Sequence, residues 1–168
     1  GQDDRQWYRN VSECERLGIP FGVYLYSYAK DTDSARSEAQ HVLRLISGHN
    51  LTYPVYYDME DDSTIGCDLT SIATTFCNTI KSAGYAVGVY ASLSWWNTYL
   101  TAPCFGQWYR WVAQYNSTCK YTGEYAIWQY SSTGRVSGIS TDVDMNYLIG
   151  YPKDHGAASS INIPDETQ

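Results

Sequence analysis

The sequence predicts an α/β fold built on a parallel sheet, and three observations support this. Runs of apolar and aromatic residues of strand length alternate with helical segments of about 12–18 residues. Several of these strand-like runs are apolar at nearly every position, which is typical of strands covered on both faces. Glycines follow the helical segments and can end them. This alternation indicates βαβ units with right-handed crossovers, and 168 residues are enough for one domain.

The individual elements follow from spacing and from capping residues. Trp7, Val11 and Cys14 recur at helical spacing before Gly18, which predicts a helix that stops at the glycine. Aspartates precede the later helices as N-caps. The predicted elements are a helix over 4–17, a strand over 19–28 covered on both faces, a helix from Asp31 or Asp33 to Gly48, a strand over 53–60, a helix from Asp68 or Thr70 to Gly84, a strand over 85–91, a short helix over 93–100, and strands over 111–115, 126–130 and 143–147.

The last three strands are joined by short loops rather than by helices. A regular barrel is therefore not expected to be complete at that end of the sheet. We assign residues 1–150 to one domain and 151–168 to a C-terminal tail or linker, because the tail is rich in proline, glycine and serine.

Composition and charge exclude several classes of function. The formal net charge is −7, which disfavours binding to nucleic-acid phosphates. No stretch approaches the roughly 18 uninterrupted apolar residues of a membrane span, and the first five residues do not form a signal peptide. Neither a nucleic-acid partner nor a membrane span is expected.

Tyrosine dominates the aromatic residues. The chain has 17 tyrosines and 6 tryptophans but only 3 phenylalanines. Rings with an apolar face and a polar edge suit a sugar ligand, whereas the alternative is that tyrosine fills strands, where its propensity is high. Composition alone leaves both interpretations open.

The cysteines and histidines show no metal-binding pattern. Five cysteines lie at spacings unlike those of zinc ligands, and the three histidines are scattered. Cys104 and Cys119 could form a disulfide in an exported protein, and buried reduced thiols are the alternative. No metal or cofactor is predicted.

Two carboxylates close one apolar strand. Asp58 and Glu60 lie two residues apart at the end of the 53–60 run, so both side chains point to the same side. Crowded carboxylates resist joint ionisation, which raises a pKa and suits a general acid. The alternative is a solvated acidic loop, because acid-x-acid also occurs elsewhere, as in Asp142-Val143-Asp144.

Several blocks together resemble the family-25 glycoside hydrolases, which are lysozymes. These blocks occur in the family's order between about residue 3 and residue 150. They are Ile19–Tyr24 with Tyr26–Ala29, Pro54–Glu60, Gly88–Ala91, Ile127–Tyr130 and Val143–Asn146.

The resemblance implies cleavage of the β-1,4 bond between N-acetylmuramic acid and N-acetylglucosamine in peptidoglycan. Glu60 matches the general acid, Asp58 the carboxylate that assists near the 2-acetamido group, and Asp144 an acid that borders the cleft. Substrate contacts are expected from five further residues, with core packing as the alternative for each ring: Tyr28, Tyr56, Tyr90, Trp128 and Gln129.

The resemblance also implies an irregular TIM-like (β/α) barrel. Family members begin with two strands, the first bearing an Asp, before the helix with which this chain opens. We therefore expect an N-terminally incomplete barrel, dimerisation through its open edge, and a secreted or cell-wall location.

Two other functions compete with a muramidase. A non-catalytic wall-binding module would keep the aromatic cleft without full catalysis. A chitinase also ends a strand in Asp-x-Glu, but the longer run of acids and glycines expected before that pair is lacking here.

Overall fold

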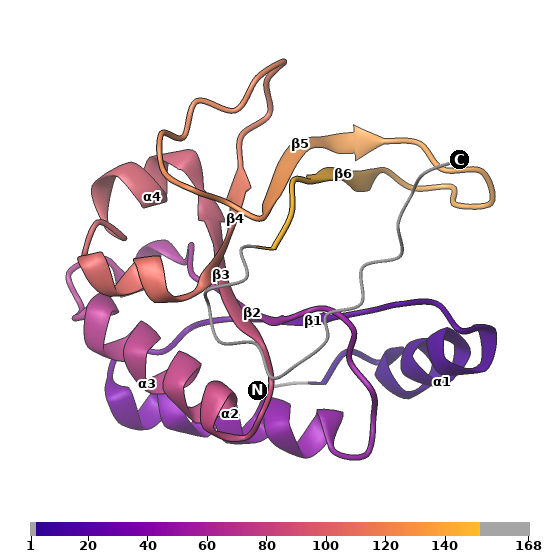
Figure 1. The fold of residues 1–168 in the computed structure, drawn as a ribbon, viewed down its shortest axis with the longest axis horizontal. Coiled ribbons are helices and arrows are strands. Elements are labelled where there is room, and N and C mark those ends of the chain that lie inside the picture. The colour runs from indigo at the N-terminus through magenta and orange to yellow at the C-terminus, as the bar shows by residue number, and fades with distance from the viewer. Residues whose placement is uncertain (1–2, 152–168) are drawn as a thin grey trace.

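The computed structural model describes residues 3–151 and contains one six-stranded sheet in sequential order (Figure 1). Strands β1 to β5 are parallel, and β6 pairs with β5 in the antiparallel sense. The predicted parallel α/β fold is confirmed. The strands are β1 (Val23–Tyr26), β2 (Val55–Asp58), β3 (Val87–Ser92), β4 (Tyr109–Ala113), β5 (Ile127–Gly134) and β6 (Val143–Leu148).

Helices fill the connections between β1 and β4, whereas β4 and β5 are joined without a helix. In Figure 1, α2, α3 and α4 lie on one side of the curled sheet, and α1 lies apart from them at the right of the view. The helices are α1 (Trp7–Leu17), α2 (Thr32–Ile46), α3 (Leu69–Ser82) and α4 (Leu93–Thr98), with two short 3₁₀ turns, η1 (Asp62–Thr64) and η2 (Pro103–Gln107).

The predicted helix ends are confirmed by their capping geometry. Asp31 and Asp68 accept hydrogen bonds from the backbone N–H of Ser34 and Ser71, which begins α2 and α3. Gly18 adopts a left-handed conformation with φ of 66° and ends α1. These local signals positioned the helices to within a few residues.

The first strand differs from its prediction. Only Val23–Tyr26 pairs as β1, and its side chains alternate between half-buried and exposed, so the prediction of a strand covered on both faces is wrong here. The reason is its position, because β1 is an edge of the sheet. The same prediction is correct for β2, whose four residues are all buried.

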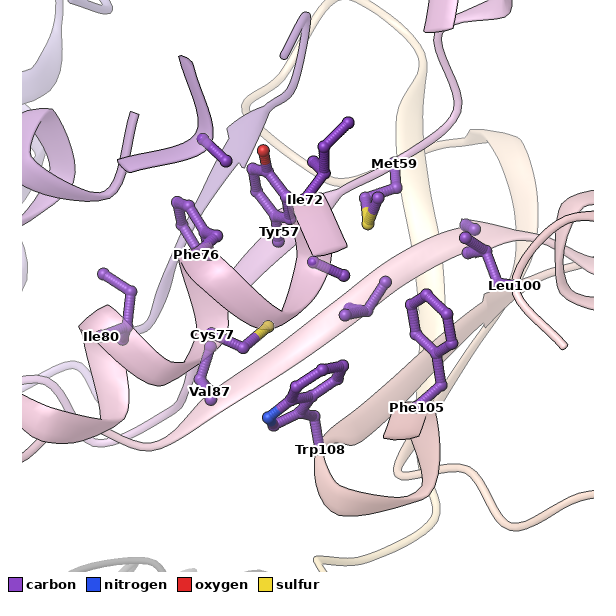
Figure 2. Close-up of a cluster of buried hydrophobic side chains, with 14 of the residues drawn as sticks. Tyr57, Met59, Ile72, Phe76, Cys77, Ile80, Val87, Leu100, Phe105 and Trp108 are labelled. Atoms are coloured by element: carbon purple, nitrogen blue, oxygen red, sulfur yellow. The ribbon is translucent and has the colours of Figure 1, made fainter. Parts of the chain in front are cut away.

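A hydrophobic core fills the space between the sheet and α2–α4. Figure 2 shows this cluster, in which the Tyr57 ring from β2 stacks on Phe76 from α3 with centroids 3.8 Å apart. Cys77 and Ile80 from the same helix are fully buried beside Phe76. The packing of α3 against β2 therefore fixes which face of β2 is left for other contacts.

The opposite, concave face of the sheet is lined by a second, aromatic cluster. Tyr56, Tyr90 and Tyr109 are buried there, and Trp111 packs against them. Gly88 lies between Tyr56 and Tyr109 in the register, and any Cβ at this position would collide with the Tyr56 ring. The glycine is therefore required for the Tyr56 ring to lie over β3 at this position.

The six strands form an open, half-barrel sheet. Within residues 3–151, β1 and β6 are its two edges and do not pair with each other. No helix in this range is long and apolar enough to cross a membrane. The five cysteines are free thiols in the structure, and the tail predicted from residue 151 lies almost entirely outside the described residues.

Candidate active site

Asp58 and Glu60 lie where β2 ends, on the concave side of the sheet. Met59 between them belongs to the hydrophobic core, so the two carboxylates point away from it. The register places Asp58 between Tyr26 of β1 and Tyr90 of β3. Asp58 is only 6% exposed and its Oδ1 has no hydrogen-bond partner, whereas Glu60 is half-buried.

The electrostatics join three carboxylates into one cluster. Burial, with a further contribution from the charge of Glu60, raises the pKa of Asp58 to about 8. Burial also raises the pKa of Glu60, and the charge of Asp144 raises it further. Both members of the Asp58–Glu60 pair therefore hold a proton more firmly than ordinary carboxyls do.

Asp144 reaches this cluster from the last strand. Because β6 runs antiparallel to β5, its first residues lie beside the C-terminal end of β5. Asp144 is exposed there. Its charge also raises the pKa of Tyr24 and Tyr90, so it faces the same concave space as the two other acids. The structure thus brings together all three carboxylates that the sequence singled out.

Tyrosines from β1 and its C-terminal end form one wall beside the acids. Tyr28 is 64% exposed, and its ring lies 5.0 Å from that of Tyr26. Tyr26 donates a hydrogen bond of 3.3 Å to Asp61 Oδ2. The exposed rings leave this wall open to a ligand.

Glu38 of α2 anchors that wall from behind. One carboxylate oxygen accepts hydrogen bonds from the Ser27 hydroxyl, at 2.9 Å, and from the Tyr57 hydroxyl, at 2.6 Å. The other accepts from the backbone N–H of Tyr28 at 3.0 Å. This partly buried network fixes the chain that leads into Tyr28.

Tyr56 and Tyr90 form the floor of the concave face rather than its rim. Both rings are buried and meet the indole of Trp111 edge-on at 5.2 and 5.0 Å. The Tyr90 hydroxyl donates to Gln129 Oε1 at 2.9 Å. Through this bond Gln129 lies on the same face as Tyr90, whereas the buried Tyr56 hydroxyl has no hydrogen-bond partner.

Trp128 lies on the other face of β5. Its ring packs against Tyr130 and Tyr147, and its indole N–H donates to the carbonyl of Gln114 at 2.9 Å. Gln129, the next residue, points to the concave side. Alternation along the strand therefore separates Trp128 from the carboxylates.

Sequence reasoning missed three residues of this site: Trp111, Tyr115 and Asn146. Trp111 Nε1 donates to Asn146 Oδ1 at 2.8 Å, and the Tyr115 hydroxyl donates to Gln129 Oε1 at 2.9 Å. Signals were available for Asn146, because it belongs to the Val143–Asn146 block and lies two residues after Asp144. Within residues 3–151, no group of three or more His, Cys, Asp or Glu side chains is arranged to hold a metal ion.

The buried carboxyl of Asp58 makes folding depend on pH. Its pKa of about 8 lies above the unfolded value of about 3.9, so the folded chain binds more protons between these values. This contribution to stability is fully present below pH ~4 and is lost as the pH rises through about 8. We expect the free energy of unfolding, measured with urea, to fall on the order of a few kcal/mol between pH 5 and pH 8.

The variant Asp58→Asn cannot ionise and should remove most of this fall. Asp62→Asn is the matched control, because Asp62 is exposed in the same acidic run. An equal pH dependence in the wild type, Asp58→Asn and Asp62→Asn would show that Asp58 is not the group responsible.

A family model described as glycosyl hydrolases family 25 matches residues 2–139. The chain belongs to this family. The matched range contains every strand of the site except β6. This strand lies beyond the match and contributes Asp144 and Asn146. The resemblance inferred from the sequence blocks is thus confirmed.

Individual relatives of this family-25 chain agree with the match. It is 28% identical to lysozyme M1 of Streptomyces globisporus over 89% of the chain and 56% of the relative. It is 29% identical to the autolytic lysozyme of Clostridium acetobutylicum over 79% of the chain and 40% of the relative. The chain therefore spans about half the length of these proteins, or less.

A solved structure of the modular autolysin LytC from Streptococcus pneumoniae has the same fold. It superposes with a TM-score of 0.80 at 33% identity and covers 87% of this chain and 38% of that one. LytC has also been solved in complex with a synthetic peptidoglycan ligand.

Proposed function

We propose that the chain is a muramidase that hydrolyses the β-1,4 bond between N-acetylmuramic acid and N-acetylglucosamine in bacterial peptidoglycan. The observation that supports this most directly is the cluster of Asp58, Glu60 and Asp144 on the concave face of a family-25 fold. In this cluster the charge of Glu60 raises the pKa of Asp58, and the charge of Asp144 raises the pKa of Glu60. Lysozymes and an autolysin solved with a peptidoglycan ligand are its relatives.

Glu60 acts as the general acid in this proposal. It is half-buried on the concave side, and its raised pKa keeps the proton that the leaving oxygen must receive. Proton donation promotes departure of the leaving sugar through an oxocarbenium-like transition state. The negative charge of Asp144 both favours protonated Glu60 and stabilises the positive charge that develops on the sugar ring.

Asp58 assists from beside Glu60. Its Oδ1 is buried without a hydrogen-bond partner, so the other oxygen of the 6%-exposed carboxyl would contact the substrate's 2-acetamido group, and burial holds the carboxyl in one position. Assistance by the acetamido group and inversion by a water molecule both begin with the proton from Glu60.

Sugar contacts are proposed for the side chains that face the same side as the acids. Tyr28 offers an exposed ring, Tyr90 and Gln129 offer polar groups deeper in the site, and Tyr56 supports them from below. A contact from Trp128 would require a glycan that also reaches the other face of β5. A secreted or wall-associated location, an N-terminally incomplete TIM-like barrel and dimerisation through its open edge stay predictions.

Product analysis tests the proposed bond. Purified peptidoglycan is digested with the chain, the new reducing ends are reduced with borohydride, and the reduced sugars are identified after acid hydrolysis. We expect reduced muramic acid. Reduced glucosamine would contradict the assignment of the bond, and bound wall material with no new reducing ends would instead favour the non-catalytic wall-binding module.

A further inference from the structure

Two side-chain amides lie opposite each other on the concave face, and aromatic residues hold the oxygen of each. Gln129 and Asn146 are cross-strand partners on β5 and β6. Gln129 Oε1 accepts from the hydroxyls of Tyr90 and Tyr115, both at 2.9 Å, and Asn146 Oδ1 accepts from Trp111 Nε1 at 2.8 Å. Within residues 3–151, neither amide nitrogen has a hydrogen bond of its own.

These contacts fix the orientation of both amides. An indole N–H can only donate, so Asn146 must present its oxygen to Trp111 and its NH₂ group elsewhere. For Gln129, the neighbouring acids decide the orientation. Burial and the charges of Glu60 and Asp58 raise the pKa of Tyr90, which therefore remains a donor. The same carboxylates attract an N–H group and repel a carbonyl oxygen.

The surroundings also restrict what the free N–H groups can bind. Asp58, Glu60 and Asp144 make this space acidic, so an anionic acceptor such as a lactyl carboxylate is disfavoured. A neutral amide carbonyl has two lone pairs and can accept from both nitrogens at once. Such carbonyls occur in peptidoglycan in the acetamido groups of the glycan and in the stem peptide.

We propose that Gln129 and Asn146 form a donor pair that binds an amide carbonyl oxygen of the substrate, that of an acetamido group. Tyr115 is a positioning residue, because its hydroxyl helps to hold Gln129 without itself belonging to the donor pair. This inference rests on the proposed glycan substrate and adds to it a basis for selectivity. The donor pair distinguishes N-acetylated from de-N-acetylated glycan.

Binding calorimetry with two soluble glycans tests the donor pair. The probes are the tetrasaccharide of N-acetylglucosamine and its fully de-N-acetylated counterpart. We expect Gln129→Met and Asn146→Leu, which remove the amides without adding charge, to weaken binding of the acetylated probe about tenfold, the effect of losing one to two neutral hydrogen bonds. Binding of the de-N-acetylated probe should change less than about twofold.

Tyr115→Phe keeps the ring and removes only the hydroxyl. It should weaken the acetylated probe several-fold and leave the other probe unaffected, a selectivity that general damage to the cleft would not produce. Asn116→Ala, which removes a carboxamide from an exposed loop, is the matched control and should change neither affinity. Circular dichroism checks that each variant folds, and Tyr115→Phe keeps the test valid if an amide variant does not.

Equal losses for both probes, or no loss for either, would overturn the donor pair. The same holds if the wild type binds neither the acetylated probe nor a glycan that bears stem peptides. A loss confined to peptide-bearing glycan would likewise overturn the proposal, because the carbonyl bound would then be one of the stem peptide and not that of an acetamido group. Because calorimetry measures binding independently of bond cleavage, selective binding without new reducing ends would remove the hydrolase proposal and retain the donor pair.

Discussion

Replacing Glu60 by glutamine is expected to lower the rate of peptidoglycan hydrolysis by about 10²–10⁴-fold, the usual contribution of a general acid. Glutamine keeps the size and shape of the side chain but has no proton of suitable acidity to give to the leaving oxygen. Glu60 is the half-buried member of the carboxylate pair, and its raised pKa is consistent with the role of proton donor. Release of reducing ends from purified cell walls measures the rate.

Asp62→Asn is the control for this substitution. Asp62 is an exposed carboxylate two residues further along the same acidic run, so its neutralisation should leave the rate within about twofold of the wild type. Unfolding of both variants by urea confirms that the fold is kept. Hydrolysis by Glu60→Gln at the wild-type rate would remove Glu60 from the mechanism.

Truncation of Phe76 to alanine should produce the largest loss of stability. Phe76 is fully buried on α3 and stacks on the Tyr57 ring, so its removal leaves a cavity between the helix and β2. Large-to-small substitutions of this kind cost about 3–5 kcal/mol, a large part of the 5–15 kcal/mol that holds a typical domain together. Urea denaturation followed by fluorescence measures the free energy of unfolding.

Asn78→Ala tests whether the effect belongs to the core. Asn78 lies on the exposed side of the same helix, and alanine has the higher helix propensity, so the change should stay within about 0.5 kcal/mol of the wild type. If Phe76→Ala lost no more stability than Asn78→Ala, the core packing between α3 and β2 would be wrong.

Local sequence signals predicted most of the fold. N-cap aspartates such as Asp31 and Asp68 and the terminating glycine Gly18 act within one turn of the chain, so each helix end is determined by nearby residues. The apolar run also predicted burial on both faces correctly for β2, which lies inside the parallel sheet. It failed for β1 because whether a strand lies at an edge is decided by the whole sheet and not by its own residues.

The site was predictable only in part, for a similar reason. Asp58 and Glu60 follow from the end of one apolar strand, and Asp144 and Gln129 from the family resemblance. Tyr115 and Trp111 belong to the site through contacts with β5 and β6 that no short motif encodes, and Asn146 was not singled out although it lies in the Val143–Asn146 block. Trp128, within a recognised block, points away because the alternation of β5 follows the pairing of the strand with its neighbours.

The side chain of Tyr57 connects the hydrophobic core to the wall beside the acids. Its ring stacks on Phe76 in the core, and its hydroxyl donates to the carboxylate of Glu38. The same carboxylate accepts from the backbone N–H of Tyr28. We expect a disturbance that loosens the packing around this ring, whether by heat, by a cosolvent or by a distant substitution, to reach the wall formed by Tyr26 and Tyr28 before the chain unfolds. Inactivation should therefore precede global melting, and a thermal inactivation curve should lie at lower temperature than the loss of helical signal.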